Sequence, residues 1–274
     1  PSYKNILHMT NQLRLAIHGA AGRMGKRLIA MGSVDPDLKL VAALEHAGHP
    51  QLGVDVGPVA GVGPLEIPLA HELETAVDAL IDFSVPEACD HIVQVCQDMG
   101  VPLVVATTGL KDSQREHISV ASQTIPIVWA PSMSMAVNLA MKLCATAGTV
   151  LKDVPSGVDV EIIERHHRFK EDAPSGTALK FGEIISGVMG QTQHVHGREG
   201  QTGKRTGHEI GYHAVRCGDN PGEHTIIFGL LGETIEINVK ASNRDCYALG
   251  ALAAAKFVAK QKPGLYTMYD VLGL

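Results

Sequence analysis

Apolar runs and helical patterns alternate along the first half of the chain. Five runs are almost wholly apolar, as expected for strands buried on both faces: Leu13–His18, Leu38–Leu44, Ala79–Phe83, Val101–Ala106 and Ile125–Trp129. Helical spacing is found between them, in Gly22–Val34, Pro86–Met99 and Asp112–Gln123. Buried strands joined by helical crossovers predict a parallel sheet covered on both faces. The Gly- and Pro-rich segment His46–Pro64 has no period and predicts a long surface loop.

The pattern changes after Pro131. Two helices are predicted, Met135–Leu151 and one from Thr177 to about Met189, and four strand-like segments: Val158–Glu164, Glu209–Arg216, His224–Phe228 and Thr234–Lys240. This mixture predicts a second, α+β domain built on an open mixed sheet. The alanine-rich final helix, Arg244–Lys260, is expected to return to the first domain. We therefore expect a first domain of residues 1–136 completed by 247–274, and a second domain over 137–246.

Composition narrows the function classes. The chain has 274 residues, 45% of them hydrophobic, which is enough for one large core or two modest ones and excludes a disordered chain. A net charge of −6 argues against nucleic acid or an anionic membrane as the main partner. The longest apolar stretch, Tyr247–Ala255, is far shorter than the ~20 residues of a membrane span. Residues 1–12 are polar and lack the apolar core of a signal peptide, so we expect a cytoplasmic protein.

A glycine-rich turn follows the first predicted strand. Gly19, Gly22 and Gly25 have the spacing G-x-x-G-x-x-G and open a helix, which suits a dinucleotide diphosphate held at the helix N-terminus. An ordinary βα turn would also use glycine, but the second strand ends in Glu45, twenty residues after Gly25, where a ribose-binding acid is expected. Polar turns beyond the later strands should line the same crevice: Ser84, Thr107–Gly109 and Ala130–Ser132.

A second group of polar residues follows the strand Val158–Glu164. Two histidines, two arginines and a lysine lie between residues 165 and 170. Pro174 and Ser175 are typical helix-start residues, which would leave the amides of Gly176 and Thr177 available to an anion. A run of solvent-exposed charged residues beside an ordinary helix cap would be enough to explain the basic residues. Histidine titrates near neutrality and therefore favours a substrate-carboxylate site with a proton donor.

The remaining polar clusters carry weaker signals. His166 and His167 are adjacent, so on an extended segment they point to opposite sides and make a poor zinc pair. The five cysteines include no C-x-x-C pair, and we expect no metal site and no disulfide framework. His194 and His196 are interpreted as surface-loop residues. The glycine-rich stretch Gly197–Gly207 is compatible with a mobile flap over a ligand and with an inert loop.

Taken together, these residues resemble the 4-hydroxy-tetrahydrodipicolinate reductase family, also called the dihydrodipicolinate reductase family, of lysine biosynthesis. The segment Glu164–Thr177 is similar to the family signature E-x-H-H-x-x-K-x-D-x-P-S-G-T. Three further segments support it in order: Gly19–Gly25, Ala106–Gly109 and Gly218–His224. The resemblance extends from Leu13 onward. It implies a Rossmann-type domain completed by the C-terminal helix, and an α+β substrate domain whose sheet assembles a homotetramer.

The resemblance also implies residue roles. His166 would be the proton donor or acceptor and Lys170 the second proton donor, while His167, Gly176 and Thr177, with Ser175 at the helix start, would bind the carboxylates of a small cyclic substrate. The reaction implied is reduction of that cyclic dicarboxylate by NADH or NADPH. The dinucleotide would be held by the glycine turn, the acid and two later turns: Gly19, Ala20, Ala21, Gly22, Arg23, Met24, Glu45, Ala106, Thr107, Thr108, Ala130, Pro131, Ser132 and Met133.

Departures from the family pattern affect the details. Ser132 and Met133 stand where the family often has asparagine and phenylalanine, and Val239 where histidine is common. His46 replaces a frequent arginine beside Glu45, from which we expect NADH to serve at least as well as NADPH. Two alternatives stay open on the residues alone. An acylating semialdehyde dehydrogenase would need an activated cysteine, and a non-catalytic dinucleotide sensor would give His166 and Lys170 no task.

Overall fold

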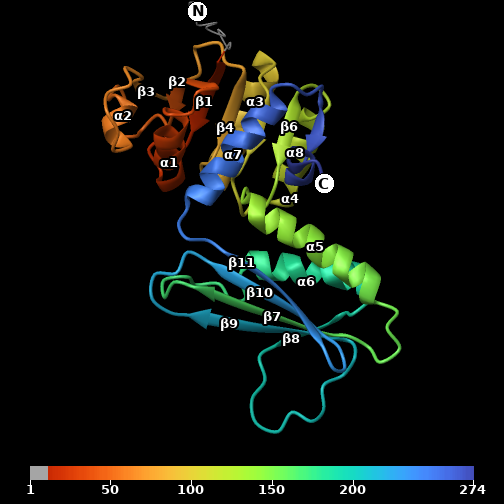
Figure 1. Ribbon diagram of the computed structural model, residues 1–274. Helices are drawn as coiled ribbons and strands as arrows, with labels where there is room; N and C mark the ends of the chain where they lie inside the picture. The colour runs from red at the N-terminus through yellow and green to blue at the C-terminus, as the bar shows by residue number, and fades with distance from the viewer. Residues whose placement is uncertain (1–11) are drawn as a thin grey trace, which may run out of the picture. The chain divides into compact units, whose positions relative to one another are not determined.

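The computed structural model describes residues 12–274, and the expectation for the first residues falls largely outside this range. The described chain divides into two compact units, one of residues up to 133 with 247–271 and one of 134–246 with 272–274. The elements of each unit are labelled in Figure 1. Each unit has its own sheet.

Seven parallel strands form the sheet of the first unit, in the order β12-β6-β5-β4-β1-β2-β3. The strands are β1 (Leu13–His18), β2 (Leu38–Leu44), β3 (Leu69–Ala70), β4 (Ala79–Asp82), β5 (Leu103–Val105), β6 (Pro126–Trp129) and β12 (Gly264–Tyr266). The helices are α1 (Arg23–Gly32), α2 (Val56–Val59), α3 (Pro86–Met99), α4 (Asp112–Ala121), α7 (Asp245–Val258) and α8 (Met268–Leu272). The doubly wound parallel sheet is thus confirmed.

Two apolar clusters lie on opposite faces of this sheet. One joins alternate strand residues such as Leu15 and Ile17 to α1 and α7, and the other joins Ala16 and Leu80 to α3 and α4. The small residues of α7 let the helix approach its neighbours closely. A Cβ added to Gly250 would collide with the Met133 carbonyl. The C-terminal helix therefore covers the first sheet, as the sequence suggested.

The sequence missed the shortest elements. The segment His46–Pro64 is not all loop, because Asp55 accepts a hydrogen bond from the Gly57 amide (2.9 Å) and starts the four-residue helix α2. Strands β3 and β12 have two and three residues, too few to show a period. Both extend the sheet at its edges.

The second unit contains a five-stranded mixed sheet in the order β11-β10-β7-β9-β8. Its strands are β7 (Asp159–His166), β8 (Gln193–His196), β9 (Glu209–Arg216), β10 (Glu223–Gly229) and β11 (Thr234–Lys240). Helices α5 (Met135–Leu151) and α6 (Gly176–Met189) pack together over one face (Figure 1). Within residues 12–274, no helix is both long and apolar enough to cross a membrane. The open mixed sheet is confirmed, and His194 and His196 lie on β8 rather than in a loop.

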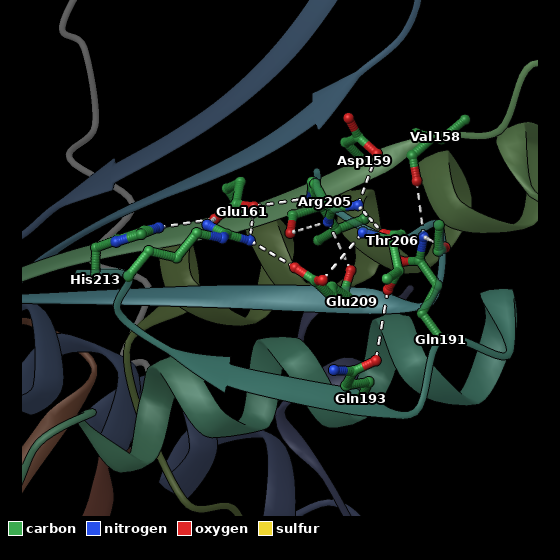
Figure 2. A network of polar contacts seen from close by, with 12 residues as sticks. Val158, Asp159, Glu161, Gln191, Gln193, Arg205, Thr206, Glu209 and His213 are labelled. Atoms are coloured by element: carbon green, nitrogen blue, oxygen red, sulfur yellow. Dashed lines mark hydrogen bonds and ion pairs between the residues drawn. The ribbon is translucent and has the colours of Figure 1, made fainter. Parts of the chain in front are cut away.

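The glycine-rich stretch crosses the uncovered face of this sheet. Since β8 and β9 are parallel neighbours, the chain must return along the sheet between them. Two arginines of this stretch hold it to β7. Arg198 donates to Glu161 at 2.8 Å. Arg205 donates to the same carboxylate at 3.0 Å (Figure 2). Arg205 also donates to Asp159 (2.6 Å). Both ends of the predicted flap are therefore tied to the sheet.

Glu161 is the centre of this polar network. Its carboxylate also contacts His213 Nε2 at 2.7 Å (Figure 2). Burial by itself opposes ionisation of Glu161, but hydrogen bonds from Arg198, His213 and Arg205 outweigh it and lower the pKa of the carboxyl to about 2. The folded state therefore holds Glu161 ionised at acidic pH, where an unfolded chain would protonate it.

We expect Glu161→Gln to lower the free energy of unfolding of the second unit by about 2 kcal/mol at pH 7, because charge-assisted hydrogen bonds are lost. The difference from the wild type should shrink as pH falls from about 4.5 toward 2, since the unfolded carboxyl takes up a proton first. Denaturant unfolding of the full chain at several pH values measures it. Glu183→Gln, which breaks only an exposed pair with Lys180, is the control. A difference that grows on acidification would contradict the assignment.

Candidate functional site

The glycine turn after β1 has the backbone that glycine permits. Gly19 has a φ of +76°, and a Cβ there would lie 2.7 Å from the Phe83 carbonyl oxygen. A Cβ on Gly25 would collide with the carbonyl oxygen of Gly19, so the third glycine lets α1 begin close against the strand. The turn is thus compact and brings backbone amides to the start of α1, where an anion is favoured.

Glu45 is joined to this turn. Its Oε1 accepts a hydrogen bond from the Ala21 amide at 3.1 Å, so the ends of β1 and β2 are tied together. A pocket with a volume of about 910 Å³ opens here. Among its lining residues are five predicted for the cofactor: Gly19, Gly22, Arg23, Met24 and Glu45. The size and the glycine turn fit a dinucleotide.

The other predicted cofactor residues lie elsewhere along the same sheet edge. Ala106–Thr108 follow β5 and Ala130–Met133 follow β6, and none of them lines this pocket. Met133 is 1% exposed and its side chain belongs to the apolar core. Ala20 is buried too, whereas Ala21 contributes its amide to Glu45.

His18 and Asp82, which the sequence analysis did not single out, form a buried pair, and His18 lines the same pocket. His18 ends β1, Asp82 ends β4, and the two residues are register partners. His18 Nδ1 lies 2.8 Å from Asp82 Oδ1. Ser84 and Thr107 also donate to the Asp82 carboxylate, at 2.6 and 2.8 Å. Thr107, predicted as a cofactor residue, thus has its hydroxyl engaged by Asp82.

In the second unit, the carboxylate of Glu164 hydrogen-bonds to two other residues of the predicted signature, His166 and Ser175. Its side chain faces α6 on the central strand β7 and the residue is 1% exposed. Arg216 binds both oxygens, at 2.8 and 2.7 Å, and the Ser175 amide donates at 3.1 Å. Burial opposes ionisation, but Arg216 and His166 outweigh it and hold the pKa of Glu164 below its usual value.

His166 is oriented by this carboxylate. Its Nδ1 lies 2.5 Å from Glu164 Oε2. Because an ionised carboxylate only accepts, Nδ1 carries a proton and Nε2 is the nitrogen free for chemistry. A Cβ on Gly222 would lie 2.9 Å from Nε2, so glycine there keeps that nitrogen clear. Burial lowers the pKa of His166 below its ordinary value, although the Glu164 contact raises it.

Ser175 caps helix α6 beside the imidazole. Its Oγ accepts from the Ala178 amide at 3.2 Å and lies 3.0 Å from His224 Nε2. The rings of His224 and His166 meet edge to face with centroids 5.3 Å apart. Burial lowers the pKa of His224 to about 4, so this ring is neutral near pH 7. The amides of Gly176 and Thr177, in the first turn of α6, have no partner within the helix by position.

Lys170 lies in the loop between β7 and α6. Its Nζ contacts Asp172 Oδ1 at 2.7 Å, and Arg216 donates to the Asp172 carbonyl at 2.6 Å. His167 Nδ1 and Arg216 Nε are buried and have no hydrogen-bond partner among the described residues. The structure therefore brings His166, Lys170, Ser175, Gly176 and Thr177 to one end of the second unit, together with Arg216 and His224, whose roles the sequence analysis did not foresee.

Family comparisons agree with this geometry. Residues 13–133 match the N-terminal domain of dihydrodipicolinate reductase, and residues 136–272 match its C-terminal domain. The chain belongs to the dihydrodipicolinate reductase family. The family predicted from the signature is confirmed, and the reductase is an oxidoreductase with a pyridine-nucleotide domain at its N-terminal side.

Curated relatives and solved structures extend the match. The reductase is 60% identical to the 4-hydroxy-tetrahydrodipicolinate reductase of Rhodopirellula baltica, over 97% of this chain and 98% of that protein. It is 47% identical to the same enzyme of Alkalilimnicola ehrlichii, over 95% and 99%. A dipicolinate-bound dihydrodipicolinate reductase from Paenisporosarcina sp. TG-14 superposes with a TM-score of 0.76 at 26% identity, covering 94% of this chain and 98% of that one. The amine dehydrogenase of Mycobacterium smegmatis shares only the fold, at 10% identity and a TM-score of 0.61 over 93% and 95% of the two chains.

We expect Glu164→Gln to lower the pKa of His166 further, because the carboxylate raises it against the effect of burial. An NMR titration of the imidazole in the reductase measures the change. Glu161→Gln is a matched control, since Glu161 lies on the same strand with its side chain on the opposite face. A pKa of His166 that rises in Glu164→Gln, or moves equally in both variants, would contradict the orienting role of Glu164.

Proposed function

We propose that this reductase converts 4-hydroxy-tetrahydrodipicolinate to tetrahydrodipicolinate, with hydride from the nicotinamide, with His166 and Lys170 as the proton donors, and with the 4-hydroxyl group leaving as water. The observation that carries the proposal is the buried Glu164–His166 pair, with Nε2 clear beside the first turn of α6. A proton donor and an anion-binding helix terminus at one place suit a cyclic dicarboxylate.

The first unit offers a site that fits a nicotinamide dinucleotide. Gly19–Met24 would hold the diphosphate and Glu45 the ribose hydroxyls. When bound, NADH or NADPH supplies the hydride. The later turns Ala106–Thr108 and Ala130–Met133 are part of the same proposal, since they follow strands at the same sheet edge.

His166 is suited to release a proton from Nε2. Burial lowers the pKa of the ring and Glu164 partly offsets this, so an imidazolium protonated at Nε2 is a stronger acid than a free imidazolium and gives up its proton readily. Lys170, half-buried and paired with Asp172, is the second donor.

Substrate carboxylates are proposed to bind the amides of Gly176 and Thr177. The helix dipole and the free N–H groups of the first turn of α6 favour negative charge there. The unpartnered Nδ1 of His167 is a further candidate ligand, because a buried polar atom without a partner is destabilising. A homotetramer assembled through the second sheet, as the resemblance implies, completes the proposal.

We expect His166→Gln and Lys170→Ala each to lower kcat by about 10²-fold or more, the usual contribution of a positioned acid or base. The assay follows NADH consumption while a coupled enzyme forms the cyclic substrate from pyruvate and aspartate semialdehyde. His117→Gln and Lys180→Ala, on exposed pairs outside the site, are controls. Folded His166 and Lys170 variants with wild-type kcat would show that other groups donate the proton.

We expect kcat/KM for NADH to equal or exceed that for NADPH. The 2′-phosphate of NADPH would place about two negative charges beside Glu45, while His46 offers a weaker clamp than an arginine. Glu45→Gln should raise the NADPH-to-NADH ratio of kcat/KM about tenfold by removing that repulsion. Both cofactors are compared at one ionic strength. A tenfold preference of the wild type for NADPH would instead mean that Arg23, which lines the pocket, or Lys26 in the same helical turn supplies the phosphate clamp.

A further inference from the structure

His18 occupies the point where the sheet of the first unit changes winding direction. The strand order places β1 between β2 and β4, so the crossover leaving β1 and the one leaving β4 run to opposite sides. In open α/β sheets this crevice is where a dinucleotide crosses the strand ends. His18 is the last residue of β1, directly before Gly19.

Asp82 fixes the orientation of the imidazole. The carboxylate is 0% exposed, and two titratable groups among residues 12–274 hydrogen-bond to it, the His18 ring and the Cys89 thiol. Ser84 and Thr107 hold it from the other sides. Because an ionised carboxylate only accepts, the His18–Asp82 hydrogen bond is donated by Nδ1–H, and the ring cannot turn without breaking that bond.

The second ring nitrogen, Nε2, is left for the pocket. The His18 ring lines the pocket with its side chain 10% exposed, and within the described chain Nε2 has no hydrogen-bond partner. Arg23 is the one arginine or lysine among the lining residues, whereas Glu45 and Glu72 are acidic. A diphosphate bound here therefore needs polar partners beyond the backbone of the glycine turn.

We propose that His18 binds the diphosphate of the dinucleotide as an imidazolium, donating Nδ1–H to Asp82 and Nε2–H to a phosphate oxygen, and that Asp82 is its positioning residue. This proposal rests on the proposed function, because it presumes that a dinucleotide occupies the pocket. It adds a ligand to the glycine turn that the G-x-x-G-x-x-G spacing does not contain.

Two variants separate the two nitrogens of the ring. His18→Asn keeps a donor at the position of Nδ1 for Asp82 and removes the group at Nε2. His18→Gln places an amide near the position of Nε2 and gives up the contact with Asp82. His117→Asn is the matched control, since His117 forms a similar pair with Asp90 outside the pocket.

Binding of ADP-ribose and AMP by calorimetry is the test, because neither ligand depends on turnover. We expect His18→Asn to weaken ADP-ribose binding about tenfold and AMP binding less than twofold, with His18→Gln within threefold of the wild type. Unchanged affinity of His18→Asn for ADP-ribose, or equal losses for both ligands, would overturn the assignment. Should His18→Asn not fold, the imidazole NMR signals of His18 in the wild type answer the same question: ADP-ribose should shift them more than AMP does, and equal shifts would overturn the assignment. A wild type that binds neither NADH nor ADP-ribose would contradict the proposed function itself, whereas normal wild-type binding with an unaffected variant contradicts only the role of His18.

Discussion

A buried carboxylate that must be saturated with donors sets the arrangement of the second unit. Glu164 is 1% exposed, and an ionised group in that position is stable only if charge and hydrogen bonds compensate its lost hydration. Arg216 from β9, His166 from β7 and the Ser175 amide at the start of α6 supply them. The register of two strands and the position of one helix therefore meet at a single side chain.

The first unit also contains a buried carboxylate that orients a histidine, but the other partners of that carboxylate are different. Asp82 is as buried as Glu164 and also orients a histidine at the end of a strand. Glu164 has a guanidinium on both oxygens, whereas Asp82 has hydroxyl donors and one imidazole. Asp82 therefore lacks the guanidinium partner that Glu164 has in Arg216.

The features that the sequence predicted correctly depend on residues that are close together in the chain. Strands such as Leu38–Leu44 were placed to the residue because buried parallel strands are continuous apolar runs, and His166 was found because its neighbours form one signature. Arg216 could not be found in this way, since it meets Glu164 only through the parallel register of β7 and β9, which pairs it with His166. The crossing over the second sheet was ambiguous for the same reason: Arg205 and Glu161 are far apart in the chain.

Strand β7 shows why the two networks can coexist. Glu161 and Glu164 are three residues apart, so the period of two sends their side chains to opposite faces of the sheet. On the helix-covered face the carboxylate binds one arginine and one histidine and orients a proton donor. On the other face a carboxylate of the same type binds two arginines and one histidine and fastens a crossing chain. The chemical difference arises from what each face packs against, because only Glu164 places its histidine beside a free helix terminus.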